Sequence, residues 1–174
     1  MNDNDNEIMS DMNIFLSASV PEAATPTITK TILRQAQDKC QEAIEALVEE
    51  WIVGKGCRIV WGGHPTIVPM LREALEKHGL RMSDWVVTYQ SREFEAQLSS
   101  DDLGLRIYTE KRDSREESLR LMRERMIGEN EFVAAVFIGG KEGVREEYEL
   151  FRKLHPSVPY FVMAGTGGVA AELM

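Results

Sequence analysis

The sequence predicts a three-layer α/β domain in which a mainly parallel sheet of about six strands carries helices on both faces. Short apolar segments with β-branched residues alternate with longer segments that repeat apolar residues at helical spacing. This alternation is typical of strand–helix–strand units, which form parallel sheets. Small residues follow several of the apolar segments, at the strand ends where α/β proteins bind ligands.

The individual elements follow from these segments. Strands are predicted at residues 12–19, 58–61, 85–89, 105–108, 132–138 and 159–163. Helices are predicted at about residues 30–53, 65–79, 114–127, 144–154 and 169–174. Gly54 and Gly56 are expected to end the first helix, and Pro65 suits the first turn of the second. Residues 21–31 are expected to form a loop and residues 90–104 an irregular polar stretch.

Length and charge limit the possible functions. The chain has 174 residues and a net charge of −9. We expect residues 12–174 to form one domain after a disordered polar tail at residues 1–11. An acidic chain without a cluster of Lys and Arg is a poor partner for nucleic acid polymers. Because the sequence has no signal-peptide pattern and no apolar run that could span a bilayer, we expect a cytoplasmic protein without a membrane partner.

Metal binding is not expected from the cysteines and histidines. Cys40 and Cys57 do not have metal-ligand spacing, and the three histidines lie far apart in the sequence. Two buried thiols are the simpler interpretation.

A glycine-rich turn follows the predicted strand at residues 132–138. Gly139, Gly140 and Gly143 separate this strand from a charged helix. A strand, a glycine turn and a helix N-terminus together form a cradle for an anion, because backbone N–H groups point at the ligand without intervening side chains. The pattern indicates a nucleotide or another phosphorylated small molecule, although a tight strand–helix connection also uses glycine. The spacing fits neither the dinucleotide fingerprint nor the P-loop, which argues against ordinary hydride transfer and ATP hydrolysis.

Small residues also follow three other predicted strands, and the four strand ends are expected to meet at one edge of the sheet. The candidate ligand-binding residues at these ends are Ser17, Ala18, Ser19, Gly62, Gly63, His64, Gly139, Gly140, Lys141, Glu142, Gly143, Gly165, Thr166, Gly167 and Gly168. His64 and Thr166 also fit helix-capping roles, and Glu147 fits a carboxylate that stabilises a helix dipole. Arg125 also fits a surface charge on the helix at residues 114–127.

Two segments resemble the SLOG superfamily, which includes DNA-processing proteins, the cytokinin-activating phosphoribohydrolases called LOG, and sensor domains of bacterial immunity. LOG proteins carry a Met-x-x-Arg-Lys segment, then a strand, then Pro-Gly-Gly-x-Gly-Thr-x-x-Glu. Residues 122–126 and 138–147 take these places here. The match implies that Arg125 and Glu147 stand where the catalytic Arg and Glu of LOG proteins do.

The match to LOG proteins is incomplete. Ile138, Val144 and Met126 replace the family's Pro, Thr and Lys, and one extra residue lies between the glycines. Since valine lacks the hydroxyl that threonine offers, these replacements argue against hydrolase activity.

Residues 15–22, 60–65, 89–92 and 137–140 resemble the SLOG sensor families that occur beside Toll/interleukin-receptor-type domains in antiviral systems. This resemblance implies a Rossmann-like fold and binding of an NAD-derived nucleotide, such as a cyclic ADP-ribose isomer. It adds Gln90 to the candidate ligand-binding residues. It also implies an effector protein as partner and a homo-oligomer.

The leading hypothesis is a domain that binds a small nucleotide and requires no cofactor. Its parts are a phosphate site at the amides of Gly139, Gly140 and Gly143, a second phosphate or ribose site at residues 165–168, and a base or sugar site at Ser17, Ser19, Gly63 and His64. Arg125 adds a positive charge in this hypothesis, and Glu147 accepts hydrogen bonds from ribose hydroxyls.

The alternative is a LOG-like hydrolase that cleaves the N-glycosidic bond of a nucleoside monophosphate through Arg125 and Glu147. A third hypothesis is a scaffold whose glycine turns only connect elements.

Overall fold

A parallel sheet of six strands forms the centre of the computed structural model, which describes residues 12–20, 29–97 and 103–174. The strands are β1 (Asn13–Ser19), β2 (Arg58–Trp61), β3 (Val86–Ser91), β4 (Leu105–Thr109), β5 (Ala134–Gly139) and β6 (Tyr160–Met163). They lie in the order β4-β3-β2-β1-β5-β6, and every neighbouring pair is parallel. The predicted α/β fold is therefore confirmed.

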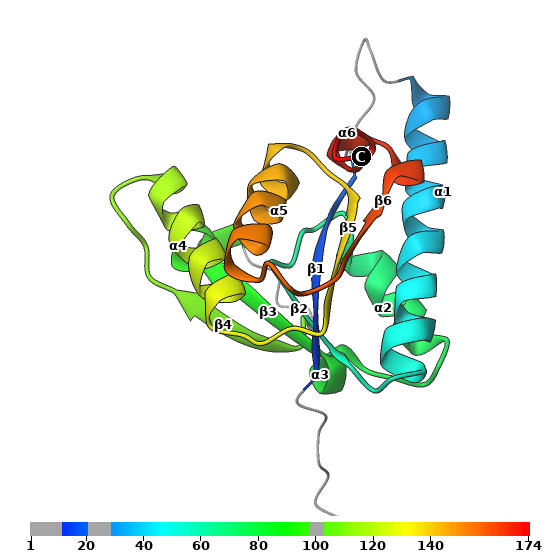
Figure 1. The fold of residues 1–174 in the computed structure, drawn as a ribbon, viewed down its shortest axis with the longest axis horizontal. Coiled ribbons are helices and arrows are strands. Elements are labelled where there is room, and N and C mark those ends of the chain that lie inside the picture. Colours follow the sequence, from blue (N-terminus) through cyan, green and yellow to red (C-terminus); the bar gives the residue numbers. More distant parts are fainter. Residues whose placement is uncertain (1–11, 21–28, 98–102) are drawn as a thin grey trace, which may run out of the picture.

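Helices cover both faces of the sheet. The α-helices are α1 (Lys30–Leu47), α2 (Val68–Glu76), α3 (Met82–Trp85), α4 (Arg115–Gly128), α5 (Glu142–Leu154) and α6 (Gly168–Glu172). A π-helical segment at Val48–Val53 prolongs α1, and 3₁₀ turns lie at Arg92–Gln97 and Ala164–Thr166. Figure 1 shows α1 and α2 on one side of the sheet and α4 and α5 on the other, as a three-layer arrangement requires.

Strand β1 lies inside the sheet, and its side chains alternate between two apolar cores. Ile14 and Leu16 pack on the side of α1 and α2. Phe15 points the other way and stacks on Phe151 of α5, with ring centroids 5.4 Å apart. All seven residues of β1 are buried. Because helices cover both faces, such a strand is apolar along most of its length rather than alternating with polar residues.

Two predicted boundaries differ from the structure near α2 and β3. Helix α2 begins at Val68 rather than near Pro65, because the carbonyl of His64 accepts hydrogen bonds from the amides of Ile67 and Val68 and closes a turn first. Trp85 was predicted as the first residue of a strand, but it ends the short helix α3.

The polar stretch predicted to be irregular is partly ordered, since Arg92–Gln97 form a 3₁₀ turn. The predicted tail at residues 1–11 and residues 21–28 of the predicted loop lie outside the described residues. In the part of the chain that the structure describes, we find no helix with the length and apolar character that crossing a bilayer requires.

The strand order reverses between β1 and β5. From β1 the chain moves outward through β2, β3 and β4, and it then returns to the other side of β1 to form β5 and β6. In open parallel sheets a crevice forms at this point, outside the carboxyl ends of the strands. The topology therefore directs attention to the carboxyl ends of β1, β2 and β5.

Candidate functional site

A cavity of about 690 Å³ opens at the carboxyl ends of β1, β2 and β3. Its wall also includes residues of α2, α4 and α5, so it extends from one helical layer across the sheet edge to the other. Its volume lies within the roughly 300–1,000 Å³ that is common for small-molecule sites. The cavity is thus the place to compare with the predicted site residues.

The structure brings about half of the predicted site residues into this cavity. Those that line it are Ala18, Ser19, Gly62, Gly63, His64, Gln90, Lys141, Gly143 and Glu147. Ser17 is buried directly beneath Glu147 and donates a hydrogen bond to Oε2 of its carboxylate. The predicted residues that do not line the cavity are Arg125, Gly139, Gly140, Glu142, Gly165, Thr166, Gly167 and Gly168.

The amides of the glycine turn after β5 are already used inside the protein. Gly139 N–H donates to Oγ1 of Thr166 at 2.7 Å, and Gly140 N–H donates to the carbonyl of Ser19 at 2.8 Å. These two amides are therefore not available to a phosphate, which corrects the role expected from the sequence. The glycines are needed for packing instead: Gly140 has φ +94°, and a Cβ there would lie 2.3 Å from a methyl carbon of Val144.

Residues 165–168 support this turn rather than the cavity. The Thr166 hydroxyl donates to the carbonyl of Met163 in addition to accepting from Gly139, so its proton is not free for a ligand. The amide of Val169 donates to the carbonyl of Gly140 at 3.0 Å. The C-terminal segment thus stabilises the turn after β5 through hydrogen bonds to Gly139 and Gly140.

The N-terminus of α5 provides the backbone donors that face the cavity. Lys141 is the N-cap residue, and no side chain caps the helix there. The amides of Val144 and Arg145 bond to the carbonyl of Lys141, whereas those of Glu142 and Gly143 have no partner among the described residues. The first N–H groups of a helix carry partial positive charge. Because Lys141 and Gly143 line the cavity, this positive helix end belongs to its wall.

Arg123 of α4 reaches the same end of the cavity. Its side chain is only 15% exposed, and its guanidinium pairs with Glu146 and lies 3.5 Å from Glu147, measured from Nε to Oε1. A Cβ on Gly143 would come within 2.9 Å of its Nη2, so the absence of a side chain at residue 143 allows this close approach. Arg123 was not among the predicted site residues.

Arg125 does not approach Glu147. Its Nε lies 2.7 Å from Glu129, its Nη1 lies 3.9 Å from Glu110, and the side chain is about one-third exposed. Arg123 follows Leu119 by four residues and therefore lies on nearly the same face of α4, next to the stripe that lines the cavity. Helical spacing is thus the signal in the sequence that points to Arg123.

Glu147 is the carboxylate of the cavity wall. Its side chain is 14% exposed, and burial raises its pKa above the ordinary value. The hydrogen bond from Ser17 and the nearby charge of Arg123 act in the opposite direction. Glu147 therefore takes up a proton more readily than a carboxylate on the surface does.

The cavity carries the opposite charge balance from the whole chain. Its described wall contains four permanently or usually cationic side chains and one carboxylate, that of Glu147. The cations are Arg72, Arg115, Arg123 and Lys141. Since the chain as a whole has a net charge of −9, this local excess of positive charge indicates a site for an anion.

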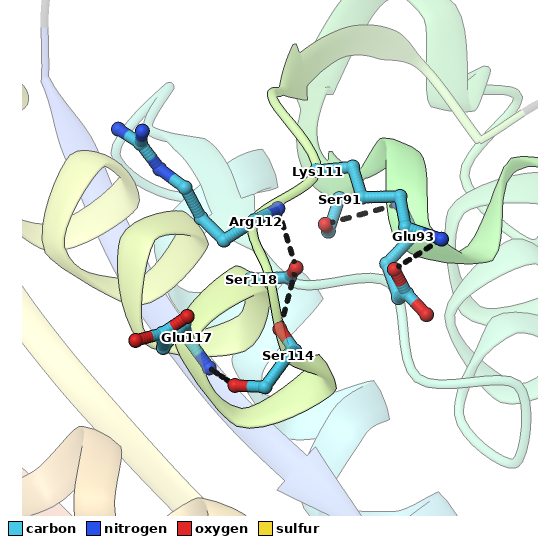
Figure 2. Close-up of polar contacts among 7 residues, drawn as sticks. All are labelled: Ser91, Glu93, Lys111, Arg112, Ser114, Glu117 and Ser118. Atoms are coloured by element: carbon cyan, nitrogen blue, oxygen red, sulfur yellow. Dashed lines mark hydrogen bonds and ion pairs between the residues drawn. The ribbon is translucent and has the colours of Figure 1, made fainter.

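A network of polar contacts holds the rim formed by the 3₁₀ turn after β3 and the start of α4. Figure 2 shows its members, Ser91, Glu93, Lys111, Arg112, Ser114, Glu117 and Ser118. The Ser114 hydroxyl accepts from the amide of Glu117 at 3.1 Å and caps α4. The buried Ser118 hydroxyl accepts from the amide of Arg112 and donates to the carbonyl of Ser114, each at 2.9 Å. These bonds fix the first turn of α4 and the loop before it.

Two side chains extend from this rim into the cavity wall. The guanidinium of Arg115 lies over the ring of Phe94, 5.0 Å from its centroid. A cation in this position is attracted by the negative face of the ring. The polar network thus positions one aromatic side chain and one cation at the cavity.

The part of the cavity wall next to α2 is apolar apart from Arg72. Trp61 forms part of its wall, and its Nε1–H donates to the Thr88 hydroxyl at 2.8 Å. That hydroxyl donates in turn to the carbonyl of Leu103 at 2.6 Å. The polar atoms of Trp61 and Thr88 are therefore satisfied within the protein, and the buried indole of Trp61 supports the cavity wall from the core side.

His64 lies at the exposed rim. Its Nδ1 is 2.8 Å from Oγ1 of Thr66, which also accepts from the amide of Val20 at 3.1 Å. In the residues that the structure describes, no group of three or more His, Cys, Asp or Glu side chains is arranged to hold a metal ion.

Comparisons with known proteins agree with this architecture. No curated protein matches the chain. The fold is similar to the X-ray structure of TM1055, target VT76 of the Northeast Structural Genomics Consortium, with a TM-score of 0.57 and 17% sequence identity over 93% of this chain and 80% of that one. At this identity the likeness concerns the fold alone.

A model of the SLOG cluster3 family matches residues 34–174, which cover most of the sheet and the whole described cavity wall except its β1 residues. The resemblance predicted from the sequence is therefore confirmed: the chain belongs to the SLOG cluster3 family.

Proposed function

We propose that the protein binds a small phosphorylated nucleotide in this cavity, with a phosphate at the N-terminus of α5. The observation that carries the proposal is the meeting of an uncapped helix N-terminus with Arg123 and Lys141 at one end of a largely apolar cavity. Membership of the SLOG family supports a nucleotide-related role, either binding or processing.

The arrangement of charge supports a phosphate at this end. Arg123 lies close to the positive end of α5, which is an unfavourable place for a cation unless negative charge is added. Glu146 and Glu147 supply part of that charge in the ligand-free protein. A phosphate there would accept hydrogen bonds from the amide of Gly143 and from Arg123, and hydrogen bonds to charged groups are the stronger ones.

The remainder of the cavity suits a nucleoside. Pro65, Pro69 and Phe94 line the cavity and are exposed or half-buried, so they offer apolar surface on which a flat ring can lie. Glu147 and Ser19 also line the cavity and can accept hydrogen bonds from ribose hydroxyls. This order of subsites replaces the one expected from the sequence, in which residues 139–140 and 165–168 held phosphates.

The finer proposal is that the ligand is derived from NAD, for example a cyclic ADP-ribose isomer, and that binding is signalled to an effector protein. Two observations favour binding without turnover. Val144 stands where LOG proteins have Thr, and Arg125, which aligns with their catalytic Arg, lies outside the cavity wall. Both observations mean that the catalytic residues of LOG proteins are incomplete here, whereas the cavity for a ligand is present.

The environment of Glu147 favours a second candidate function, a hydrolase. The pKa of Glu147 is raised by burial inside the cavity. A carboxyl group with a raised pKa keeps its proton more readily than an ordinary one, which suits a general acid in N-glycosidic bond cleavage. A LOG-like phosphoribohydrolase is therefore the alternative.

Calorimetric titration tests the proposal. We expect AMP, ADP-ribose, NAD or a cyclic ADP-ribose isomer to bind the unmodified protein, and Arg123→Ala to weaken binding about tenfold or more. Arg125→Ala is the matched control, because it removes the same charge from the same helix outside the cavity, and it should leave the affinity unchanged. Equal losses in the two variants, or no heat with any of the nucleotides, would contradict the proposed site.

A second measurement separates binding from turnover. Chromatography of the reaction mixtures shows whether free base is released from AMP or NAD. Release that disappears in Glu147→Gln would establish the hydrolase, whereas binding without release supports the ligand-binding function.

A further inference from the structure

Gln90 is a buried polar side chain of the cavity wall with an unused hydrogen-bonding group. It lies next to the carboxyl end of β3, is only 7% exposed, and forms part of the cavity wall. Its Oε1 is buried and has no hydrogen-bond partner. A buried polar atom without a partner costs free energy, and most proteins avoid it. An exception inside a cavity indicates that a ligand provides the missing partner.

The neighbouring polar groups do not provide it. The indole N–H of Trp61 bonds to Thr88, and the Thr88 hydroxyl bonds to the carbonyl of Leu103. The hydroxyl of Ser91, the next residue along β3, accepts from the amide of Glu93. Gln90 is thus a residue of the cavity wall whose carboxamide oxygen has no partner. Oε1 is shielded from solvent in the ligand-free protein, and rotation about the terminal χ3 bond, which has only a broad preference in glutamine, turns it toward a ligand in the cavity.

The backbone in front of Gln90 leaves room for a ligand. Gly63 follows β2 and has φ +72°, a conformation that residues with side chains rarely adopt. A Cβ at this position would lie 2.6 Å from Cγ2 of Thr88 and 3.5 Å from Nε2 of Gln90. Any side chain at residue 63 would therefore approach the carboxamide, and glycine keeps it accessible.

We infer that Gln90 reads the edge of the ligand's base, and that this base carries an amino group next to a ring nitrogen, as adenine does. A carboxamide presents one acceptor beside one donor, and this pair matches an exocyclic amino group beside a ring nitrogen. The inference rests on the proposed function, because the phosphate at α5 places the nucleoside in the part of the cavity that contains Gln90.

Two probes that differ only in this amino group test the inference. They are AMP and purine riboside 5′-monophosphate, which lacks the 6-amino group. We expect the unmodified protein to bind AMP about tenfold more tightly. Gln90→Leu should bind both probes with similar affinity, because leucine keeps most of the volume and cannot form hydrogen bonds.

A second variant distinguishes the failure of this inference from that of the proposed function. Arg123→Ala should weaken both probes by the same factor and keep the preference for AMP, because it acts on the phosphate. If both probes bind equally to the unmodified protein and both depend on Arg123, the role of Gln90 is wrong and the nucleotide site stands. If neither probe binds, both proposals are overturned.

The ligand-free protein gives an independent reading. Since Gln90→Leu removes an unpartnered polar atom, its melting temperature should equal or exceed that of the unmodified protein. A clear decrease would show that Gln90 serves the fold rather than a ligand and would overturn the inference.

Discussion

The amide of Gly139 and the hydroxyl of Thr166 are joined by a 2.7 Å hydrogen bond across 27 positions of the chain. The same hydroxyl donates to the carbonyl of Met163. One side chain therefore connects the end of β5 to the segment after β6. The sequence around Thr166, a threonine among glycines, resembles a phosphate-binding loop. Because its hydroxyl is bonded within the protein, Thr166 supports the structure around the cavity and does not line the cavity itself.

Replacing Thr166 by valine should lower the free energy of unfolding by about 1–3 kcal/mol, because the buried amide of Gly139 loses its acceptor. Thr166→Ser keeps the hydroxyl and should cost clearly less. Urea unfolding of the three proteins measures the difference. Equal stabilities of the valine and serine variants would show that the hydroxyl does not carry the connection.

Gly168 should tolerate no side chain. It has φ +60°, and a Cβ would lie 2.5 Å from the carbonyl oxygen of Gly140. We expect Gly168→Ala to destabilise the protein by roughly 1–3 kcal/mol. Gly165→Ala is the control, because a Cβ there meets no atom within 4 Å. Thermal unfolding should separate the two variants, and similar melting temperatures would contradict the close packing of residues 168 and 140.

A methyl group at residue 143 should affect ligand binding more than stability. Gly143 lies in the first turn of α5, where alanine is a good helix former, but its Cβ would come within 2.9 Å of Nη2 of Arg123. The flexible guanidinium would move away from the helix end. We therefore expect Gly143→Ala to keep its melting temperature and to bind AMP several-fold more weakly. Unchanged affinity would mean that Arg123 does not bind the phosphate from this position.

Glu147 should make stability depend on pH in a defined direction. Its folded-state pKa is raised above 4.5, so the folded protein holds a proton that the unfolded chain has released. The free energy of unfolding therefore falls as pH rises from 4.5 through the folded-state pKa. Glu147→Gln lacks this contribution, so it should become more stable relative to the unmodified protein over that range.

Urea unfolding at several values between about pH 4.5 and pH 7.5 measures this trend. A difference between the two proteins that stays constant, or that changes in favour of the unmodified protein as pH rises, would contradict the raised pKa of Glu147.

The strands and most helices could be predicted because their signals are local. The apolar run at residues 132–138 predicts a strand buried on both faces, which the structure has as β5 at Ala134–Gly139. The spacing of Val144, Tyr148 and Phe151 fits the buried face of α5. Helix α3 could not be predicted in this way. It has only four residues, which is too short for a helical period to be visible.

The candidate site could be predicted only in part, for two physical reasons. Glycines serve close backbone packing as well as ligand binding, and the sequence does not show whether the amides of Gly139 and Gly140 are already bonded. In addition, Arg72 reaches the cavity through the tertiary arrangement of α2, and no motif marks it. Gln90 was found through a resemblance, but its unpartnered oxygen becomes visible only in the structure.

The contrast between an acidic exterior and a cationic interior has a kinetic consequence. Within about a Debye length of the surface an anion meets the repulsion of the net negative charge of the molecule, and it is attracted only after it has entered the mouth of the cavity. Dissolved salt screens the outer repulsion over a longer path than the inner attraction. Raising the ionic strength should therefore increase the association rate constant of a charged ligand and shorten its residence time. The association rate constant then reports on the charge of the exterior, and the dissociation rate constant reports on the charge of the cavity.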